Sequence, residues 1–574
     1  MPNTRITRHP DRDWRAANVL SLPSRHTLQC GAMSRLTTRK KLTLAVFAGI
    51  TLVYAGLSPG AINNQGYMGG NVTAASQIVS TLGSWLTLHS GPEPVKIPRH
   101  GLLEPVFEIP FILVSRILFG HSPEWDDRLV SLQPILATSL LCALVFVWVR
   151  KITASDAWAY TLALATAFTT ILWPYAYMAM EPTQSLFLFL AGYLALGAET
   201  RNTWRRWIAI ALCAGVAISV KANGAALVPA MACLILTQLR RTRTDGERGP
   251  LSWRKPVVLI AILGPLYGLS AFTRWLSPWY LWWSNLSNFR ATMVPVPYMP
   301  LNLLSLFGSA NKGLFVYCPI TMLSLFLIPK AYKEDKCTTL FAGLVLAFSA
   351  IGCSVLIYWS DETWGPRYLH VAIAPLIICL ALAIRRIQFR LGAKAVLAAL
   401  ASWGLVVGFL GAFFYYGLLQ GVAAATSPST LEQLQGDVQW NPILFHARLF
   451  KLWLRSSDAP VQDDDYWPAE PHYWMNDPNR QIPYNPMNIR GLARPQALLV
   501  KNWGARTASS DGVLWWLCLA SLLSGAGALV WSGYRIAGET DTAPAGEVVQ
   551  AGAGGDQATT GRAAPDDQER GRSS

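Results

Sequence analysis

Long apolar segments alternate with short polar gaps along most of the chain. A helix needs about 20 apolar residues, at 1.5 Å per residue, to cross roughly 30 Å of hydrocarbon. Twelve segments approach that length, which predicts an all-α, polytopic integral membrane protein with about twelve transmembrane helices. The expected spans are 42–58, 129–149, 157–176, 184–199, 206–221, 223–239, 257–276, 313–329, 339–358, 368–384, 395–416 and 513–534.

Basic residues fall in every second gap between these segments. Cytoplasmic loops of membrane proteins carry an excess of Lys and Arg. If the N-terminus is cytoplasmic, all the basic gaps lie on the cytoplasmic side, together with the basic tail 1–41 and the Ala-, Gly- and Asp-rich tail 536–574, which we expect to be disordered. The gaps concerned contain Arg150-Lys151, Arg201 with Arg205-Arg206, Arg240 to Lys255, Lys330 to Lys336, and Arg385 to Lys394.

The opposite face receives most of the polar sequence. Three long outer segments are expected there, 59–128, 277–312 and 417–512. The last of these is rich in Trp and Pro and is long enough for a small extracytoplasmic unit. The chain therefore divides into a membrane domain, 42–416, this outer segment, and a final span, 513–535.

The first outer segment contains two helical patterns. Apolar residues from Val72 to Leu86 recur at helical spacing, which predicts an amphipathic helix on the outer membrane surface. A helix that faces a protein core would show the same spacing. Residues 103–119 are apolar but interrupted by Glu104, Glu108 and prolines, which predicts a juxtamembrane or re-entrant helix.

The composition restricts the possible partners and cofactors. Only 14% of residues are charged, against about 25% in soluble domains, and 52% are hydrophobic. The net charge of +15 is carried by short gaps between apolar segments, so it indicates membrane lipids rather than nucleic acid. The nine cysteines are scattered singly, and no metal-type spacing occurs. We expect no cofactor, although Asp463-Asp464-Asp465 could bind a divalent cation; a solvated loop explains that triplet better.

Charged residues at the outer ends of spans are the candidates for chemistry. Ionisable groups beside hydrocarbon are costly unless they are paired or reach water, and they therefore mark functional sites. Carboxylates can deprotonate an acceptor hydroxyl, and cations can neutralise a departing phosphate. A structural salt-bridge network would use the same residue types; near Arg367 the rings of Trp359, Trp364 and Tyr368 could equally form an interfacial belt. The candidates are Glu104, Glu108, Glu181, Lys221, Lys312, Asp361, Glu362, Arg367 and Tyr368.

Four stretches resemble motifs of bacterial polytopic proteins related to GT-C type glycosyltransferases. Ser309–Pro319 resembles the pattern SPGKGLFLYSP, and Trp364–Leu369 resembles WGPRYL. Met180–Pro182 resembles the SEP element, and 98–110 resembles KYGPGQSLLAIP. The resemblance implies a GT-C-like fold and inverting transfer of a sugar from a polyprenyl-phosphate carrier. The acceptor would be a glycan, lipid or protein on the extracytoplasmic face of the plasma (inner) membrane.

The sequence departs from the family pattern in one place. GT-C enzymes usually carry an acidic residue soon after the first span, whereas residues 61–67 here contain none. We therefore predict Glu104 as the base with Glu108 in support, ahead of Asp361 and Glu362, which lie close to Arg367 in sequence.

Other residues are assigned to the donor. Lys312 and Arg367, with Tyr368, are predicted to bind the donor phosphate; Lys221 is a further candidate, and Glu181 reads as a helix-capping residue before Pro182. A lipid-linked saccharide transporter or flippase, or a non-catalytic membrane scaffold, stays open as an alternative to an enzyme.

Overall fold

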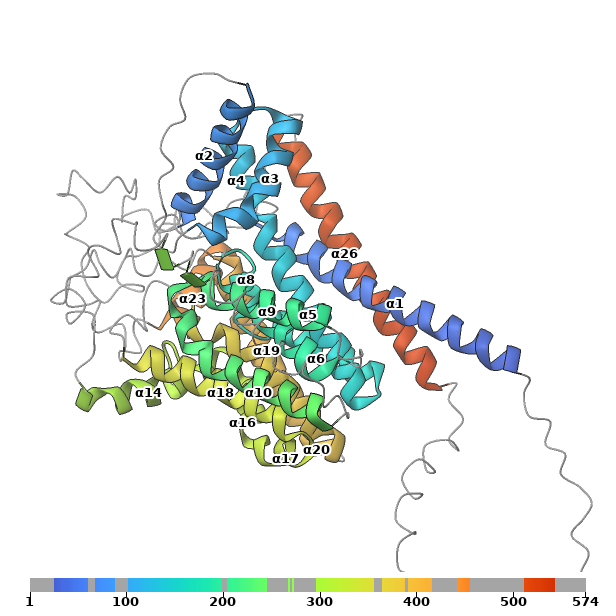
Figure 1. The fold of residues 1–574 in the computed structure, drawn as a ribbon. Coiled ribbons are helices and arrows are strands. Elements are labelled where there is room, and N and C mark those ends of the chain that lie inside the picture. Colours follow the sequence, from blue (N-terminus) through green and yellow to red (C-terminus); the bar gives the residue numbers. More distant parts are fainter. Residues whose placement is uncertain are drawn as a thin grey trace, which may run out of the picture.

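The computed structural model describes residues 25–59, 68–87, 102–178, 180–198, 204–244, 267–268, 271–272, 296–355, 364–387, 391–414, 441–454 and 510–541. Within these ranges every regular element is a helix, as Figure 1 shows, which confirms the all-α fold class. The longer helices are α1 (Arg25–Gly56), α2 (Met68–Thr87), α3 (Leu103–Phe119), α4 (Pro123–Val130), α5 (Leu132–Thr153), α6 (Asp156–Phe168), α8 (Met180–Gly192), α9 (Trp204–Ser219), α10 (Val228–Thr244), α14 (Met299–Gly308), α16 (Pro319–Phe326), α17 (Ile328–Glu334), α18 (Lys336–Ser354), α19 (His370–Arg386), α20 (Leu391–Phe413), α23 (Pro442–Leu454) and α26 (Ser510–Asp541).

Five helical stretches among the described residues are long and apolar enough to cross a membrane: Pro123–Thr153, Lys336–Ser354, Arg367–Arg386, Leu391–Phe413 and Val513–Ala537. Several of the other expected spans form shorter helices. The segment 313–329, for example, is divided into α15 (Leu314–Tyr317) and α16, because Pro319 cannot continue the preceding helix. The multi-pass membrane architecture is confirmed, whereas the number twelve stays a prediction. Segment 257–276 lies almost entirely outside the described residues.

α19 forms the centre of the bundle. Its residues from His370 to Ile384 are all buried, and a helix that is apolar on every side belongs in the interior. α5, α8, α16, α17 and α18 pack around it. The residues that begin α19 are therefore held in place by several helices at once.

The first and last helices of the chain, α1 and α26, lie side by side at one edge of the bundle (Figure 1). Glycines permit this close packing: a Cβ on Gly56 would meet the Cys518 carbonyl oxygen and Leu522 at 2.7 Å. Gly49 packs in the same way against Leu529 and Gly525. This order of contacts makes the two helices antiparallel, so residues 25 and 541 lie at the same end of the pair.

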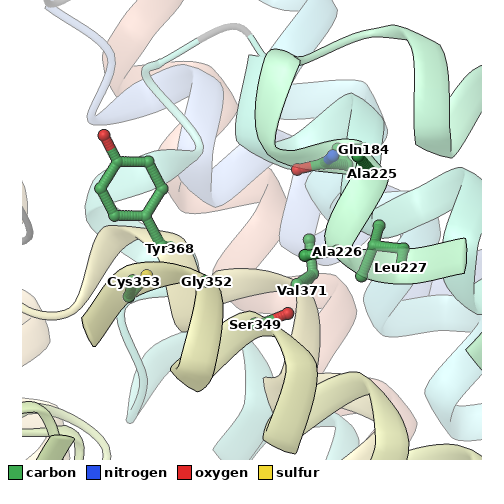
Figure 2. Close-up of a pocket in the computed structure, with 9 residues that line it drawn as sticks. All are labelled: Gln184, Ala225, Ala226, Leu227, Ser349, Gly352, Cys353, Tyr368 and Val371. Carbon is green, nitrogen blue, oxygen red and sulfur yellow. The ribbon is translucent and has the colours of Figure 1, made fainter. Parts of the chain in front are cut away.

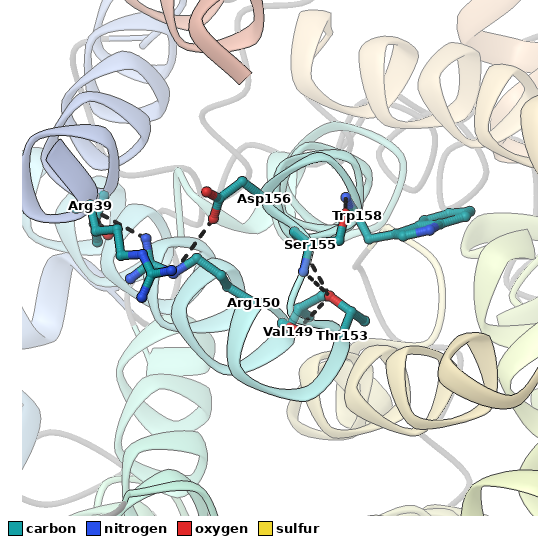
Figure 3. Close-up of polar contacts among 8 residues, drawn as sticks. Arg39, Val149, Arg150, Thr153, Ser155, Asp156 and Trp158 are labelled. Atoms are coloured by element: carbon teal, nitrogen blue, oxygen red, sulfur yellow. Dashed lines mark hydrogen bonds and ion pairs between the residues drawn. The ribbon is translucent and has the colours of Figure 1, made fainter. Parts of the chain in front are cut away.

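Basic residues gather at the end of the bundle where α1 begins. Figure 3 shows Arg150, near the end of α5, within 3.7 Å of the Asp156 carboxylate and donating a hydrogen bond to the Arg39 carbonyl oxygen. The Ser155 hydroxyl, which caps α6, accepts a hydrogen bond from the Trp158 amide. Lys151 donates to the Gly197 carbonyl oxygen, at the end of the π-helix η1 (Tyr193–Gly197) that continues α8. Contacts of Arg150 and Lys151 thus join the end of α5 to α1, to the start of α6 and to the end of η1.

Helices α2, α3 and α4 pack together at the other end of the bundle (Figure 1). The helix expected between Val72 and Leu86 is present as α2, and Val72, Ala75 and Val79 are buried against Ile112 of α3 and Val130 of α4. The described part of its apolar face therefore packs on α3 and α4, and the position of α2 on the outer membrane surface stays a prediction. α3, the expected juxtamembrane helix, buries one face and exposes apolar side chains such as Leu113 and Ile117 on the other.

Candidate functional site

The first two turns of α8 carry four consecutive or nearly consecutive polar side chains, and all are buried: Glu181, Thr183, Gln184 and Ser185. Glu181 and Ser185, four residues apart, share one face of the helix, whereas Thr183 and Gln184 face other parts of the bundle because successive helical residues are 100° apart. Their hydrogen-bond partners lie on the η5 turn before α19, on α3, on α9 and on α19 itself. The start of α8 is therefore a polar centre within an apolar bundle.

Glu181 is the charged member of this centre. Its Oε1 accepts hydrogen bonds from Lys221 Nζ and Arg367 Nε, and all three side chains are at most 6% exposed. Lys221 follows the end of α9 in extended conformation. Arg367 opens the 3-10 helix η5 (Arg367–Leu369), which leads into α19. One carboxylate thus joins two cations from distant parts of the sequence.

The turn before Arg367 depends on two neighbours in the WGPRYL stretch. Gly365 has φ +64, a conformation that side chains disfavour, and a Cβ there would meet the Tyr317 ring at 2.8 Å. Trp364 is fully buried and packs edge-on against Tyr317, with ring centroids 5.3 Å apart. The stretches 309–319 and 364–369, which carry the two strongest motifs, therefore pack on each other and fix the direction in which Arg367 leaves the turn.

Tyr368 joins the cations to an apolar pocket. Its ring centroid lies 4.9 Å from Lys221 Nζ and 5.9 Å from Arg367 Cζ, within cation–π range. The same ring lines a pocket of about 160 Å³, shown in Figure 2, between the η2 turn (Ala222–Leu227), α18 and the start of α19. The other lining residues are Gln184, Ala225, Ala226, Leu227, Ser349, Gly352, Cys353 and Val371.

Glu104 forms a second polar cluster, which Thr183 joins to α8. Its Oε1 accepts hydrogen bonds from Thr183 Oγ1 at 3.1 Å and from Gln133 Nε2 at 3.5 Å. Glu104 Oε2 and both carboxyl oxygens of Glu108 have no hydrogen-bond partner among the described residues. Burial raises the pKa of Glu104 to about 8, with a further rise from the Glu181 charge, and burial also raises the pKa of Glu108. Both carboxyls are therefore readily protonated.

Residues 109–266 match the family model of dolichyl-phosphate-mannose-protein mannosyltransferases. The match supports the resemblance to GT-C type glycosyltransferases that the motifs indicated. It includes the polar residues of α8 together with Gln133 and Lys221, whereas Glu104 and Arg367 lie outside it.

Two crystal structures are also similar to this chain. They are ArnT from Cupriavidus metallidurans in the apo state, over 88% of this chain and 78% of that one, and ArnT bound to undecaprenyl phosphate, over 87% and 78%. Both have 14% sequence identity and a TM-score of 0.40. No curated protein sequence matches this chain.

The structure brings Lys221 and Arg367 together among the predicted residues. Arg367 shares Glu181 with Lys221, while Lys312 is buried in the turn after α14, where its amide donates to Ser309 Oγ. The sequence interpretation of Glu181 as a capping residue overlooked these two cations. Asp361 and Glu362 lie outside the described residues.

Arg367 is 5% exposed and Trp364 is fully buried, which disfavours the interfacial belt for these two residues; Trp359, the third ring considered for it with Tyr368, lies outside the described residues.

Sequence reasoning missed His370 and Ser185. His370 Nδ1 lies 2.6 Å from Ser185 Oγ, and its ring packs at 5.2 Å from that of Tyr175. A histidine at the start of an apolar span was the available signal. No metal-binding group of three or more His, Cys, Asp or Glu occurs within the described ranges, and Asp463–Asp465 lies outside them.

Proposed function

We propose that this protein transfers a sugar from a polyprenyl-phosphate carrier to an acceptor hydroxyl, with inversion. The observation that carries the proposal is the buried cluster of Glu181, Lys221 and Arg367 beside Tyr368 and an apolar pocket. The family match over residues 109–266 supports the same reaction class.

The donor phosphate is assigned to Arg367 and Lys221. Glu181 contributes one negative charge and the two cations contribute two positive charges, so the three together favour an anion. In a site of low dielectric, positioned cations stabilise the charge that develops on a departing phosphate. The guanidinium of Arg367 presents a planar set of donors that matches two phosphate oxygens, whereas Lys221 acts as a point charge. Lys312 is a supporting cation from a neighbouring turn.

The apolar pocket is assigned to the first units of the carrier lipid. It begins at the Tyr368 ring, which both cations contact, and most of its lining is apolar (Figure 2). A phosphate held by Arg367 and Lys221 would therefore have hydrocarbon directly beside it on the protein side. This pairing of charge and apolar surface suits a lipid phosphate better than a soluble sugar phosphate.

Glu104 is assigned as the base on the acceptor side. Its raised pKa makes the carboxylate a stronger proton acceptor than an ordinary glutamate. In the proposed step Glu104 takes the acceptor's hydroxyl proton, the acceptor oxygen forms a bond to the anomeric carbon, and the bond from that carbon to the phosphate oxygen breaks. The electron pair leaves with the phosphate, where Arg367 and Lys221 neutralise it. Glu108, one turn along α3, supports Glu104.

The face of the reaction is assigned from the basic residues. The polar start of α8 and the beginning of α19 lie at the ends of those helices opposite to the Lys151 and Arg386 contacts. Because basic ends mark the cytoplasmic side, the site faces the extracytoplasmic side of the inner membrane.

Binding of undecaprenyl phosphate to the purified protein in nanodiscs tests the donor assignment. Arg367→Ala and Lys221→Ala each leave Glu181 with one cation, so the fold is retained while affinity falls by about 10- to 100-fold, the value of a charge-assisted hydrogen bond. The control is Arg386→Ala, which removes a cation paired with Glu334 at the basic end and should bind as the wild type does. Equal binding by all variants would contradict the proposal, and binding without sugar transfer would favour a lipid-linked saccharide transporter.

A further inference from the structure

We infer that Ser185 and His370 form a positioning pair that holds Arg367 on the donor phosphate, an inference that rests on the proposed function. Two contacts join α8 to the segment that begins α19: one is an ion pair and the other is a hydrogen bond. Glu181 pairs with Arg367, and one turn further along α8 Ser185 pairs with His370 at 2.6 Å.

The spacing of the four residues explains the register. Glu181 and Ser185 are four residues apart on α8, so they lie on the same helical face. Arg367 and His370 are three residues apart across a 3-10 turn, in which side chains at that spacing eclipse each other. The two contacts therefore form two rungs between the same pair of faces, and a shift of either helix would break both.

Arg367 needs this support because the helical segment that carries it is only three residues long. It lies on a three-residue 3-10 helix that follows the Gly365 turn, and α19 begins only at His370. The Ser185–His370 contact thus holds the first residue of α19, three positions after Arg367. A register error at His370 would carry Arg367 away from Glu181 and Lys221.

The surroundings of His370 fix its ring. The side chain is 1% exposed, and the Tyr175 ring packs against it with centroids 5.2 Å apart. Ser185 is 2% exposed, so bulk water does not compete for this hydrogen bond. A buried hydrogen bond of this kind contributes more to orientation than an exposed one, because no competing partner is available.

The test measures undecaprenyl phosphate binding for variants of both residues. Ser185→Ala and His370→Leu should each weaken binding by about fivefold, and the double variant should be no weaker than the single ones, because both lose the same hydrogen bond. His370→Asn places a polar atom where Nδ1 lies and should restore binding. Ser139→Ala on α5 is the matched control, a buried serine whose hydroxyl has no described partner.

The outcomes separate this inference from the proposed function. If Arg367→Ala loses binding while Ser185→Ala behaves like Ser139→Ala, the positioning role is wrong and the donor assignment stands. If Ser185→Ala and His370→Leu lower thermal stability equally and neither changes affinity, the pair is only structural and the inference is overturned. If Arg367→Ala binds as the wild type does, the proposed function itself fails.

Discussion

Glu181 and Arg367 lie 186 residues apart in sequence and form a buried ion pair in which the Arg367 guanidinium donates to the Glu181 carboxylate. Lys221 shares the same carboxylate oxygen. The pair connects the start of α8 with the turn that leads into the central helix α19. The ion pair therefore contributes to stability and, in the proposed reaction, positions Arg367 for the donor phosphate.

The structural consequence is tested by Glu181→Gln. This change leaves two cations buried without their carboxylate, and breaking a buried ion pair costs about 3–5 kcal/mol of stability. Thermal unfolding in detergent should show a large loss, and adding Lys221→Met should restore part of it. The control is Glu124→Gln, which removes a carboxylate paired with Arg128 at the surface of α4 and should change stability little. Equal behaviour of the two variants would show that the buried cluster is not required for folding.

Arg367→Lys tests the geometry of phosphate binding. The variant keeps the charge but loses the planar pair of donors, so donor affinity should fall by about tenfold. Binding of undecaprenyl phosphate measures the change. If the lysine variant binds as tightly as the wild type, only charge matters at this position, and the bidentate contact is not made.

Filling the pocket tests the lipid assignment. Gly352 lines the pocket on α18, and a leucine there should occupy its volume and weaken lipid binding. Gly343→Leu is the matched control on the same helix, since a Cβ at Gly343 meets no atom within 4 Å. Competition with a short-chain prenyl phosphate measures both variants. Equal loss in the two would indicate a general effect on α18, and no loss in Gly352→Leu would place the carrier elsewhere.

The pH dependence tests Glu104. Because its folded-state pKa is about 8, against about 4.3 in an unfolded chain, the folded protein holds a proton that the unfolded chain releases. Stability should therefore fall as pH rises between these two values, and Glu104→Gln should remove that part of the slope. Transfer should rise with pH toward about 8 as the carboxylate forms, and Glu104→Gln should abolish transfer while donor binding persists. An active Glu104→Gln enzyme would rule out this base.

The membrane orientation has its own test. Single cysteines at Ser429 and Thr244, in a chain whose native cysteines are replaced, should react differently with a membrane-impermeant thiol reagent. Ser429 should be labelled from outside. Thr244 should be labelled only after permeabilisation, because it ends α10 among basic residues, which we expect on the cytoplasmic side. The reverse pattern would move the site to the cytoplasmic face.

The sequence predicted the elements of this molecule better than their pairing. Apolar periodicity identified the helical fold and α2 and α3, and the WGPRYL resemblance indicated Arg367 and Tyr368. The sequence could not show that Glu181 binds Arg367 and Lys221. These partners are 186 and 40 residues away from Glu181, and contacts at such separations leave no local sequence pattern. Lys312 and Arg367 were assigned to the same phosphate because both open apolar segments, and the role of Lys312 stays a prediction. Helix lengths also depend on tertiary packing, which explains why some expected spans are shorter helices.

A structure of the protein with undecaprenyl phosphate would show where the donor phosphate and its lipid bind. In that structure the phosphate should lie within hydrogen-bond distance of Arg367 and Lys221, the first prenyl units should enter the pocket beside Tyr368 and Gly352, and Glu104 should face the side of the sugar opposite the phosphate. A phosphate bound away from both cations, with the pocket beside Tyr368 empty of lipid, would contradict the proposal.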